Sequence, residues 1–133
     1  MRTTLLATLL LGAAPAVAAP KSPPLPPKPI VVTVNMFDRG FHPDIIRLRS
    51  GVTYRLVFIN RDGTTHDFFA PRLLEDSQIS REEGDKLQDG RLDVPAHGEA
   101  SLVLMPMRAE PYDAKSTKAL DVVSNMRAQV LVY

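Results

Sequence analysis

The sequence predicts an all-β protein, a two-layer sandwich or a barrel with one short helical insert. Apolar, β-branched segments recur at a spacing of roughly 8–12 residues, with turn residues between them. A single charged segment, residues 70–91, interrupts this rhythm and carries a helix-start signal. The chain contains no cysteine, so packing of the core has to hold the fold without disulfides.

The chain begins with features of an export signal. Arg2 precedes an apolar stretch from Leu5 to Ala14, and Ala16-Val17-Ala18 provides small residues for cleavage. We therefore expect residues 1–19 to be a signal peptide and the mature protein, about 115 residues long, to be one domain. The expected location is the periplasm or the exterior of the cell. Without a cysteine to carry a lipid, we expect no membrane insertion after signal cleavage.

Proline dominates the next ten residues. The stretch from Pro20 to Pro29 reads P-K-S-P-P-L-P-P-K-P, and proline both fixes φ and removes a backbone donor. We interpret residues 20–29 as a proline-rich linker of extended polyproline II structure. The folded domain is then expected to cover residues 30–133.

The first half of that domain has the period-two pattern of strands. In each predicted strand one set of alternating apolar residues shares a face, and Gly or Asp-Gly turns separate the strands. The expected strands are Ile30–Met36, Ile45–Arg49 and Val52–Asn60, and a short apolar segment follows at His66–Phe69.

The second half contains the insert and two further strands. In the insert, Ser80-Arg81-Glu82-Glu83 fits a capping box, which predicts a short helix. We expect strands from Ala100 to Met107 and from Ala128 to Tyr133. The core is expected to include Tyr54, Leu56, Phe58, Leu104 and Val130.

Charge and cysteine content exclude several functions. The formal net charge is +1, and loss of Arg2 with the leader leaves acidic and basic residues balanced. That balance argues against a polybasic protein that binds nucleic acid or a membrane surface. The absence of cysteine excludes thiol catalysis, iron–sulfur clusters and copper–thiolate centres.

An ordered series of residues gives the chain a family resemblance. The pattern F-x-P-x-x-I-x-L-x-x-G-x-x-Y-x-L-x-F-x-N begins at Phe41 and is followed by His66. This resembles small periplasmic cupredoxin-like domains, including the non-blue kind attached to EfeO-type iron-uptake proteins. The resemblance covers residues 30–133 and implies a Greek-key β-sandwich with a copper site between loops at one end.

The resemblance also implies a set of metal ligands, which this chain matches only in part. His66 falls at the first histidine ligand and Met126 at the methionine ligand. Ser116 occupies the expected cysteine position, and Asp121 occupies that of the second histidine. A serine hydroxyl is a poor ligand for Cu(I) and gives no thiolate charge transfer, so type 1 electron transfer is excluded.

Two functions remain open from the sequence. The first is weak copper binding or metal handling at a reworked site of His66, Met126 and Asp121. The second is a metal-free interaction module with a periplasmic protein partner, in which His66 is a half-buried histidine bonded to a backbone carbonyl. We do not expect an enzyme: Ser116, His66 and Asp121 are the residue types of a hydrolytic triad, but Ser116 lacks a glycine-rich elbow.

Overall fold

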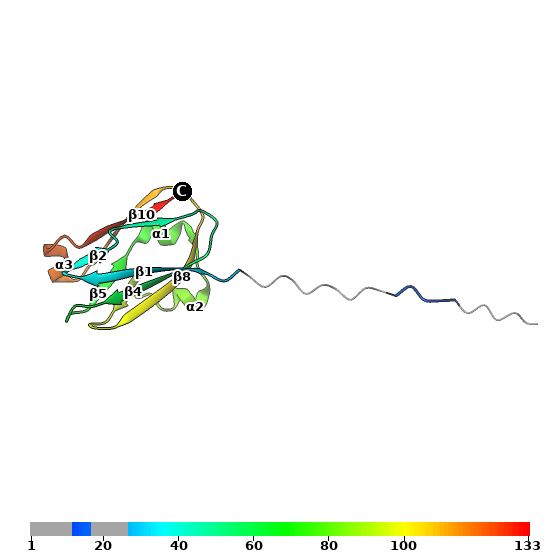
Figure 1. Ribbon diagram of the computed structural model, residues 1–133, viewed down its shortest axis with the longest axis horizontal. Coiled ribbons are helices and arrows are strands. Elements are labelled where there is room, and N and C mark those ends of the chain that lie inside the picture. The colour runs from blue at the N-terminus through cyan, green and yellow to red at the C-terminus, as the bar shows by residue number, and fades with distance from the viewer. Residues whose placement is uncertain (1–11, 17–26) are drawn as a thin grey trace, which may run out of the picture.

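The structure is a computed structural model that describes residues 12–16 and 27–133 (Figure 1). The predicted signal peptide and proline-rich linker therefore lie largely outside the described residues. Two five-stranded sheets pack face to face, which confirms the predicted all-β sandwich. In spatial order the first sheet comprises β2 (Gly40–His42), β1 (Ile30–Phe37), β4 (Tyr54–Asn60), β8 (Glu99–Pro106) and β6 (Ser77–Gln78). The second comprises β3 (Ile45–Leu48), β10 (Arg127–Val132), β9 (Pro111–Lys115), β5 (His66–Phe69) and β7 (Arg91–Val94).

The chain crosses between the two sheets at nearly every connection from β2 to β9. As a result, β1 pairs with β4 in parallel, and β3 pairs with β10 in parallel. The remaining ladders are antiparallel, for example Tyr54 opposite Leu104 between β4 and β8. This crossing pattern is the Greek-key arrangement of a β-sandwich.

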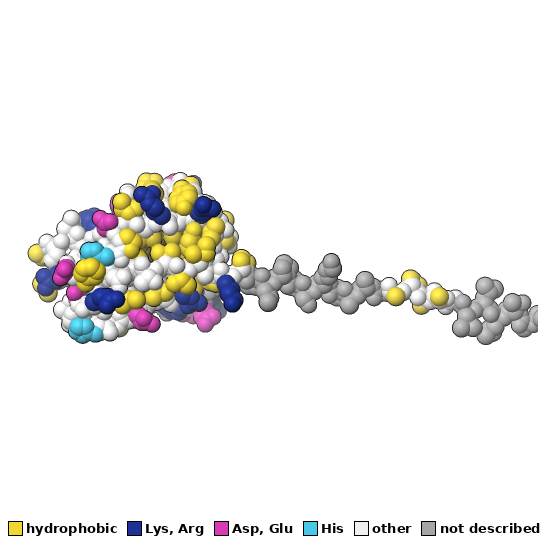
Figure 2. Space-filling model, viewed as in Figure 1, with side chains coloured by type: hydrophobic (Ala, Val, Ile, Leu, Met, Phe, Trp, Pro, Cys, Tyr) yellow, Lys and Arg dark blue, Asp and Glu magenta, His cyan; other side chains and the backbone are white. Residues whose placement is uncertain are grey.

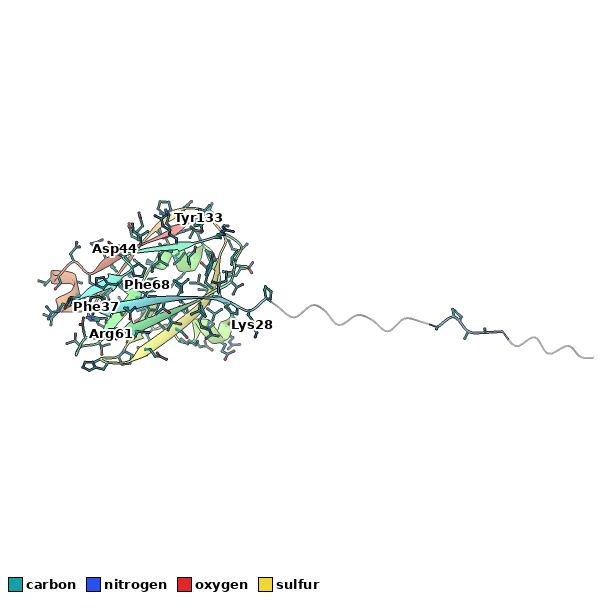
Figure 3. All side chains as sticks on the ribbon, viewed as in Figure 1. Lys28, Phe37, Asp44, Arg61, Phe68 and Tyr133 are labelled. Carbon is teal, nitrogen blue, oxygen red and sulfur yellow. The ribbon has the colours of Figure 1, made fainter. Side chains whose placement is uncertain are left out.

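Alternating residues of the strands fill the space between the sheets. Phe58 of β4 is 0% exposed, and its ring lies 4.6 Å from that of Phe68 on the opposite sheet. Phe68, labelled in Figure 3, also meets Phe41 edge-on at 6.3 Å, so three aromatic rings join the layers. All five residues predicted for the core are buried: Tyr54, Leu56, Phe58, Leu104 and Val130.

The helical insert forms as two short helices, α1 (Pro71–Glu75) and α2 (Arg81–Gly84). Ser80 caps α2 by accepting a hydrogen bond from the Glu83 N–H at 3.2 Å, which confirms the predicted helix start. The Glu83 carboxylate accepts a hydrogen bond from the Val103 N–H at 2.9 Å and pairs with Lys86. Glu83, three residues after the cap, thus fixes the insert to β8.

The sequence did not predict the strands β2, β6, β7 and β9 or the short helix α3 (Ala119–Val123). The N-cap residue of α3, Lys118, makes no side-chain capping bond. Its only buried residue is the polar Asp121, whereas Leu120 and Val123 are exposed. A helix that buries an acid and exposes its apolar residues has no amphipathic signal in the sequence.

On the face drawn in Figure 2, basic and acidic side chains are interspersed around an apolar patch. No helix among residues 12–16 and 27–133 is long and apolar enough to cross a membrane.

Ionisation of Tyr112 in β9 should lower the stability of the protein at alkaline pH. Burial and a hydrogen bond from its hydroxyl to Asp76 at 3.0 Å raise the pKa of Tyr112 from 10.0 to about 12. A raised folded-state pKa gives stability that is present below pH 10 and is lost as the pH rises to about 12. Urea unfolding of the protein and of Tyr112→Phe across this range should show a smaller pH-dependent loss in the variant. An equal loss in both would contradict this assignment.

Candidate functional site

The candidate site lies at the end of the sandwich that carries α3 and the turn between β1 and β2 (Figure 1). His66 is the first residue of β5, and Asp62 lies in the turn between β4 and β5. Ser116 directly follows β9, and Asp121 lies in α3. Four positions spread over 60 residues of sequence thus meet at one end of the fold.

His66 is fully buried and contacts a carboxylate on each side of its ring. Its Nδ1 lies 2.6 Å from Asp121 Oδ2, and its Nε2 lies 2.8 Å from Asp62 Oδ2. Each contact is a hydrogen bond only if a proton lies between the nitrogen and the oxygen. The structure therefore differs from the expected half-buried histidine bonded to a backbone carbonyl: both ring nitrogens are engaged by carboxylates.

Asp62 joins this histidine to the surface turn between β1 and β2. Its carboxylate accepts hydrogen bonds from the backbone N–H groups of Asp38 and Arg39, each at 3.1 Å. Partial burial acts to raise the pKa of Asp62. The hydrogen bonds from Arg39, His66 and Asp38 outweigh burial and hold that pKa below its ordinary value of 3.8. Asp62 is therefore a stable anion near neutral pH.

Asp121 extends the contacts in the other direction. The Ser116 hydroxyl lies 2.6 Å from Asp121 Oδ2 and 3.0 Å from Asp67 Oδ1, so its one proton is shared between two acceptors. Asp67 in turn accepts hydrogen bonds from the Thr117 N–H, at 2.6 Å, and from the Thr117 hydroxyl. We call the connected side chains the buried polar chain: Asp62, His66, Asp121, Ser116 and Asp67.

Met126 lies beside the buried polar chain. Its side chain is 2% exposed, and its N–H donates to the Asp121 carbonyl at 2.9 Å. Met126, Ser116 and Asp121 line a cavity of about 50 Å³, and His66 is not among the residues that line it. The structure thus brings His66 and Asp121 into direct contact, whereas Met126 shares a cavity with Asp121 and Ser116 that His66 does not line.

The residues present do not fit a type 1 copper centre. The cysteine position holds Ser116, whose hydroxyl already donates within the buried polar chain. The carboxylates of Asp121 and Asp62 contact opposite nitrogens of the His66 ring. A metal ion bound to one ring nitrogen could therefore be coordinated by only one of the two carboxylates. Within the described residues, no three His, Cys, Asp or Glu side chains are grouped so that they could hold a metal ion. Copper binding by His66, Asp121 and Met126 stays a prediction.

The arrangement is also unlike that of a hydrolytic triad. A serine nucleophile needs its hydroxyl against the imidazole, with the acid behind the ring. Here Asp121 lies between Ser116 and His66, and all three side chains are buried. The other two histidines, His42 and His97, are exposed.

Sequence reasoning missed Asp62 and Asp67. Asp62 lies four residues before His66, and Asp67 directly follows it. An acidic residue on either side of a candidate ligand was a usable signal. It was overlooked because Asp62 fits equally well as a solvated turn residue.

No protein-family model matches the chain, and no curated protein matches it. Solved structures do. Auracyanin B has a TM-score of 0.58 at 15% identity, covering 82% of this chain and 93% of that protein. An apo-form copper binding protein has a TM-score of 0.55 at 17% identity, covering 77% of this chain and 86% of that one. The metal binding domain of the Cu(I)-exporting P-type ATPase CopA of Streptococcus pneumoniae D39, solved with Cu(I), has a TM-score of 0.51 at 11% identity, covering 77% and 84%. The chain therefore has a cupredoxin-like fold, as the sequence pattern implied.

Proposed function

We propose that this chain is a metal-free cupredoxin-like interaction module of the periplasm, which works through contact with a protein partner. The observation that carries this proposal is the engagement of both His66 nitrogens by the carboxylates of Asp62 and Asp121. A copper ion at either ring nitrogen would have to displace the carboxylate that lies against that nitrogen.

The buried polar chain can hold the loops at this end of the sandwich together. It connects the turn between β1 and β2, the start of β5, the residue after β9, and α3. Charged hydrogen bonds at 2.6–2.8 Å are among the stronger ones in proteins. This end of the sandwich can therefore be held in one conformation without an ion.

The periplasmic location rests on the leader-like residues 1–19. A soluble domain exported without cysteine needs no oxidative folding, and this chain forms a closed core of aromatic and aliphatic side chains. We place the protein partner in the same compartment, because the leader-like residues 1–19 would carry the domain there.

Weak copper binding is the second candidate. Ser116, Asp121 and Met126 share a small cavity, and two of the structurally similar proteins are named for binding copper or were solved with it. Copper at Nδ1 of His66 would have to displace the proton shared with Asp121, so its affinity should fall as the pH is lowered.

A copper titration of protein purified after expression of the full chain distinguishes the two candidates. We expect no one-to-one complex tighter than about 1 μM with Cu(II) or Cu(I), measured by calorimetry and native mass spectrometry. The copper-treated protein should show no intense visible band, because no thiolate is present. A tight one-to-one complex that is lost in His66→Gln would overturn the metal-free proposal.

A positive control is available in the same chain. Ser116→Cys combined with Asp121→His restores the ligand types of a type 1 centre. The two positions are in contact in the structure, where Ser116 Oγ lies 2.6 Å from Asp121 Oδ2. A visible charge-transfer band in this double variant would show that the assay detects a centre at this corner.

A further inference from the structure

The outer face of the second sheet carries a row of cationic and aromatic side chains. Arg127 of β10 lies opposite Lys115 of β9, and Lys115 lies opposite Phe69 of β5. Phe69 in turn lies opposite Arg91 of β7. We call these four residues the cationic row; they are direct neighbours across four adjacent strands.

The side chains of the cationic row point away from the core. The residues next to them in sequence, Ala128, Ala114, Phe68 and Leu92, are all buried, and successive residues of a strand face opposite sides. The Arg91 guanidinium lies 5.3 Å from the centre of the Phe69 ring, and the Lys115 ammonium lies 5.8 Å from it. An aromatic ring between two cations holds them near each other at the surface.

A groove lies over part of this row. Its volume is about 280 Å³, and Phe69, Lys115 and Arg127 line it together with Arg72, whereas Arg91 does not. Arg72 is paired with Glu110 at 2.8 Å, and Arg127 Nε donates a hydrogen bond to Asn125 Oδ1 at 2.7 Å. The ion pairs formed within residues 27–133 include neither Lys115 nor Arg127. Among the described residues, these two cations of the groove therefore have no ion-pair partner.

The chemistry of the groove favours one class of ligand. The strands β10, β9 and β5 lie about 4.8 Å apart, so the groove residues Arg127, Lys115 and Phe69 span about 10 Å, which exceeds the size of a single inorganic anion. In an extended peptide, side chains two residues apart are separated by about 6.6 Å, so two carboxylates can reach the two cations. Asp113 also lines the groove and can accept a hydrogen bond from a peptide N–H, a donor that a polyphosphate lacks.

We propose that this groove binds a carboxylate-rich, extended segment of a protein partner. The proposal rests on the proposed function as an interaction module and adds the docking face and the chemistry of the partner. The docking face is the outer surface of β10, β9 and β5 beside Arg72 of α1, not the end of the sandwich that carries His66. Because the contacts are exposed ion pairs, binding should weaken strongly with salt.

The test uses a fluorescently labelled octaglutamate peptide and protein purified after expression of the full chain. Fluorescence anisotropy at about 10 mM salt should detect binding that is much weaker at about 150 mM salt. Lys115→Gln with Arg127→Gln should weaken binding about tenfold, since two ion pairs are lost. The matched control is Arg47→Gln with Arg55→Gln, which also removes two exposed strand cations but lies outside the groove. It should change binding by less than about twofold.

Each result decides the proposal. Absence of peptide binding at low salt, or equal weakening by both double variants, would overturn it. Competition by inorganic phosphate at the same charge concentration as the peptide would also overturn it, because the site would then be one for a small anion. Circular dichroism of both double variants excludes unfolding as the cause of any loss. The copper titration described above is independent of this groove, so failure of either proposal is recognised separately.

Discussion

Replacing Asp121 with alanine should lower the free energy of unfolding by about 2–5 kcal/mol, because two buried polar side chains, His66 and Ser116, each lose their closest polar partner. His66 is 0% exposed and would keep only the Asp62 carboxylate, on its other nitrogen. The Ser116 hydroxyl would lose its acceptor at 2.6 Å as well. Urea unfolding at neutral pH, followed by circular dichroism, measures the loss.

Asp93→Ala is the matched control for this prediction. Asp93 also forms an ion pair, with Lys118 at 3.0 Å, but its side chain is 42% exposed. Exposed pairs contribute about 0–1 kcal/mol, so this variant should unfold almost as the parent does. If Asp121→Ala cost no more than Asp93→Ala, the buried polar chain would not be what holds the loops at this end.

Phe58→Ala should cost about 3–5 kcal/mol, the range observed when a buried phenylalanine is truncated in a packed core. Phe58 is 0% exposed in the central strand β4, and its ring packs at 4.6 Å against Phe68 of the other sheet. Removing the ring leaves a cavity between the two layers, which the flanking strands cannot close without breaking their ladders. The midpoint of urea unfolding should fall accordingly.

Phe37→Ala is the control for the core prediction. Phe37 is 37% exposed and stacks on His42 at the surface, with a distance of 3.9 Å between ring centroids. Its loss removes less buried area and leaves no closed cavity, so we expect a cost of about 1 kcal/mol or less. Equal costs for the two variants would show that the aromatic contact between the layers is not central to stability.

Much of the fold could be predicted because the pattern of apolar residues in the first strands indicates which face of each strand is buried. In the segment from Tyr54 to Asn60, the alternating residues Tyr54, Leu56 and Phe58 were expected to share a face, and the structure buries all three. Ser80 could be recognised as a helix cap because its hydroxyl acts on a backbone N–H only three residues away. Such signals are local, and local sequence is enough to read them.

The strand β9 and the helix α3 were missed for the opposite reason. The helix α3 buries Asp121 because His66 and Ser116 are there to bond it, and both come from elsewhere in the fold. In β9, Ala114 and Tyr112 face the core, but a small residue and a polar aromatic give a weak period-two pattern. Tertiary partners outweigh local propensity at both elements.

The sequence alone determined that this protein has no thiolate centre, because no cysteine is present at any position. It also predicted which faces of the main strands point inward. Only the tertiary structure decided that His66 lies between Asp62 and Asp121, and that Arg127, Lys115 and Arg91 share one row with Phe69. The physical reason is that periodicity along a strand determines the direction of each side chain, whereas its neighbours across the sheet depend on strand order and register. Asp121 lies 55 positions from His66, and no local pattern specifies that contact.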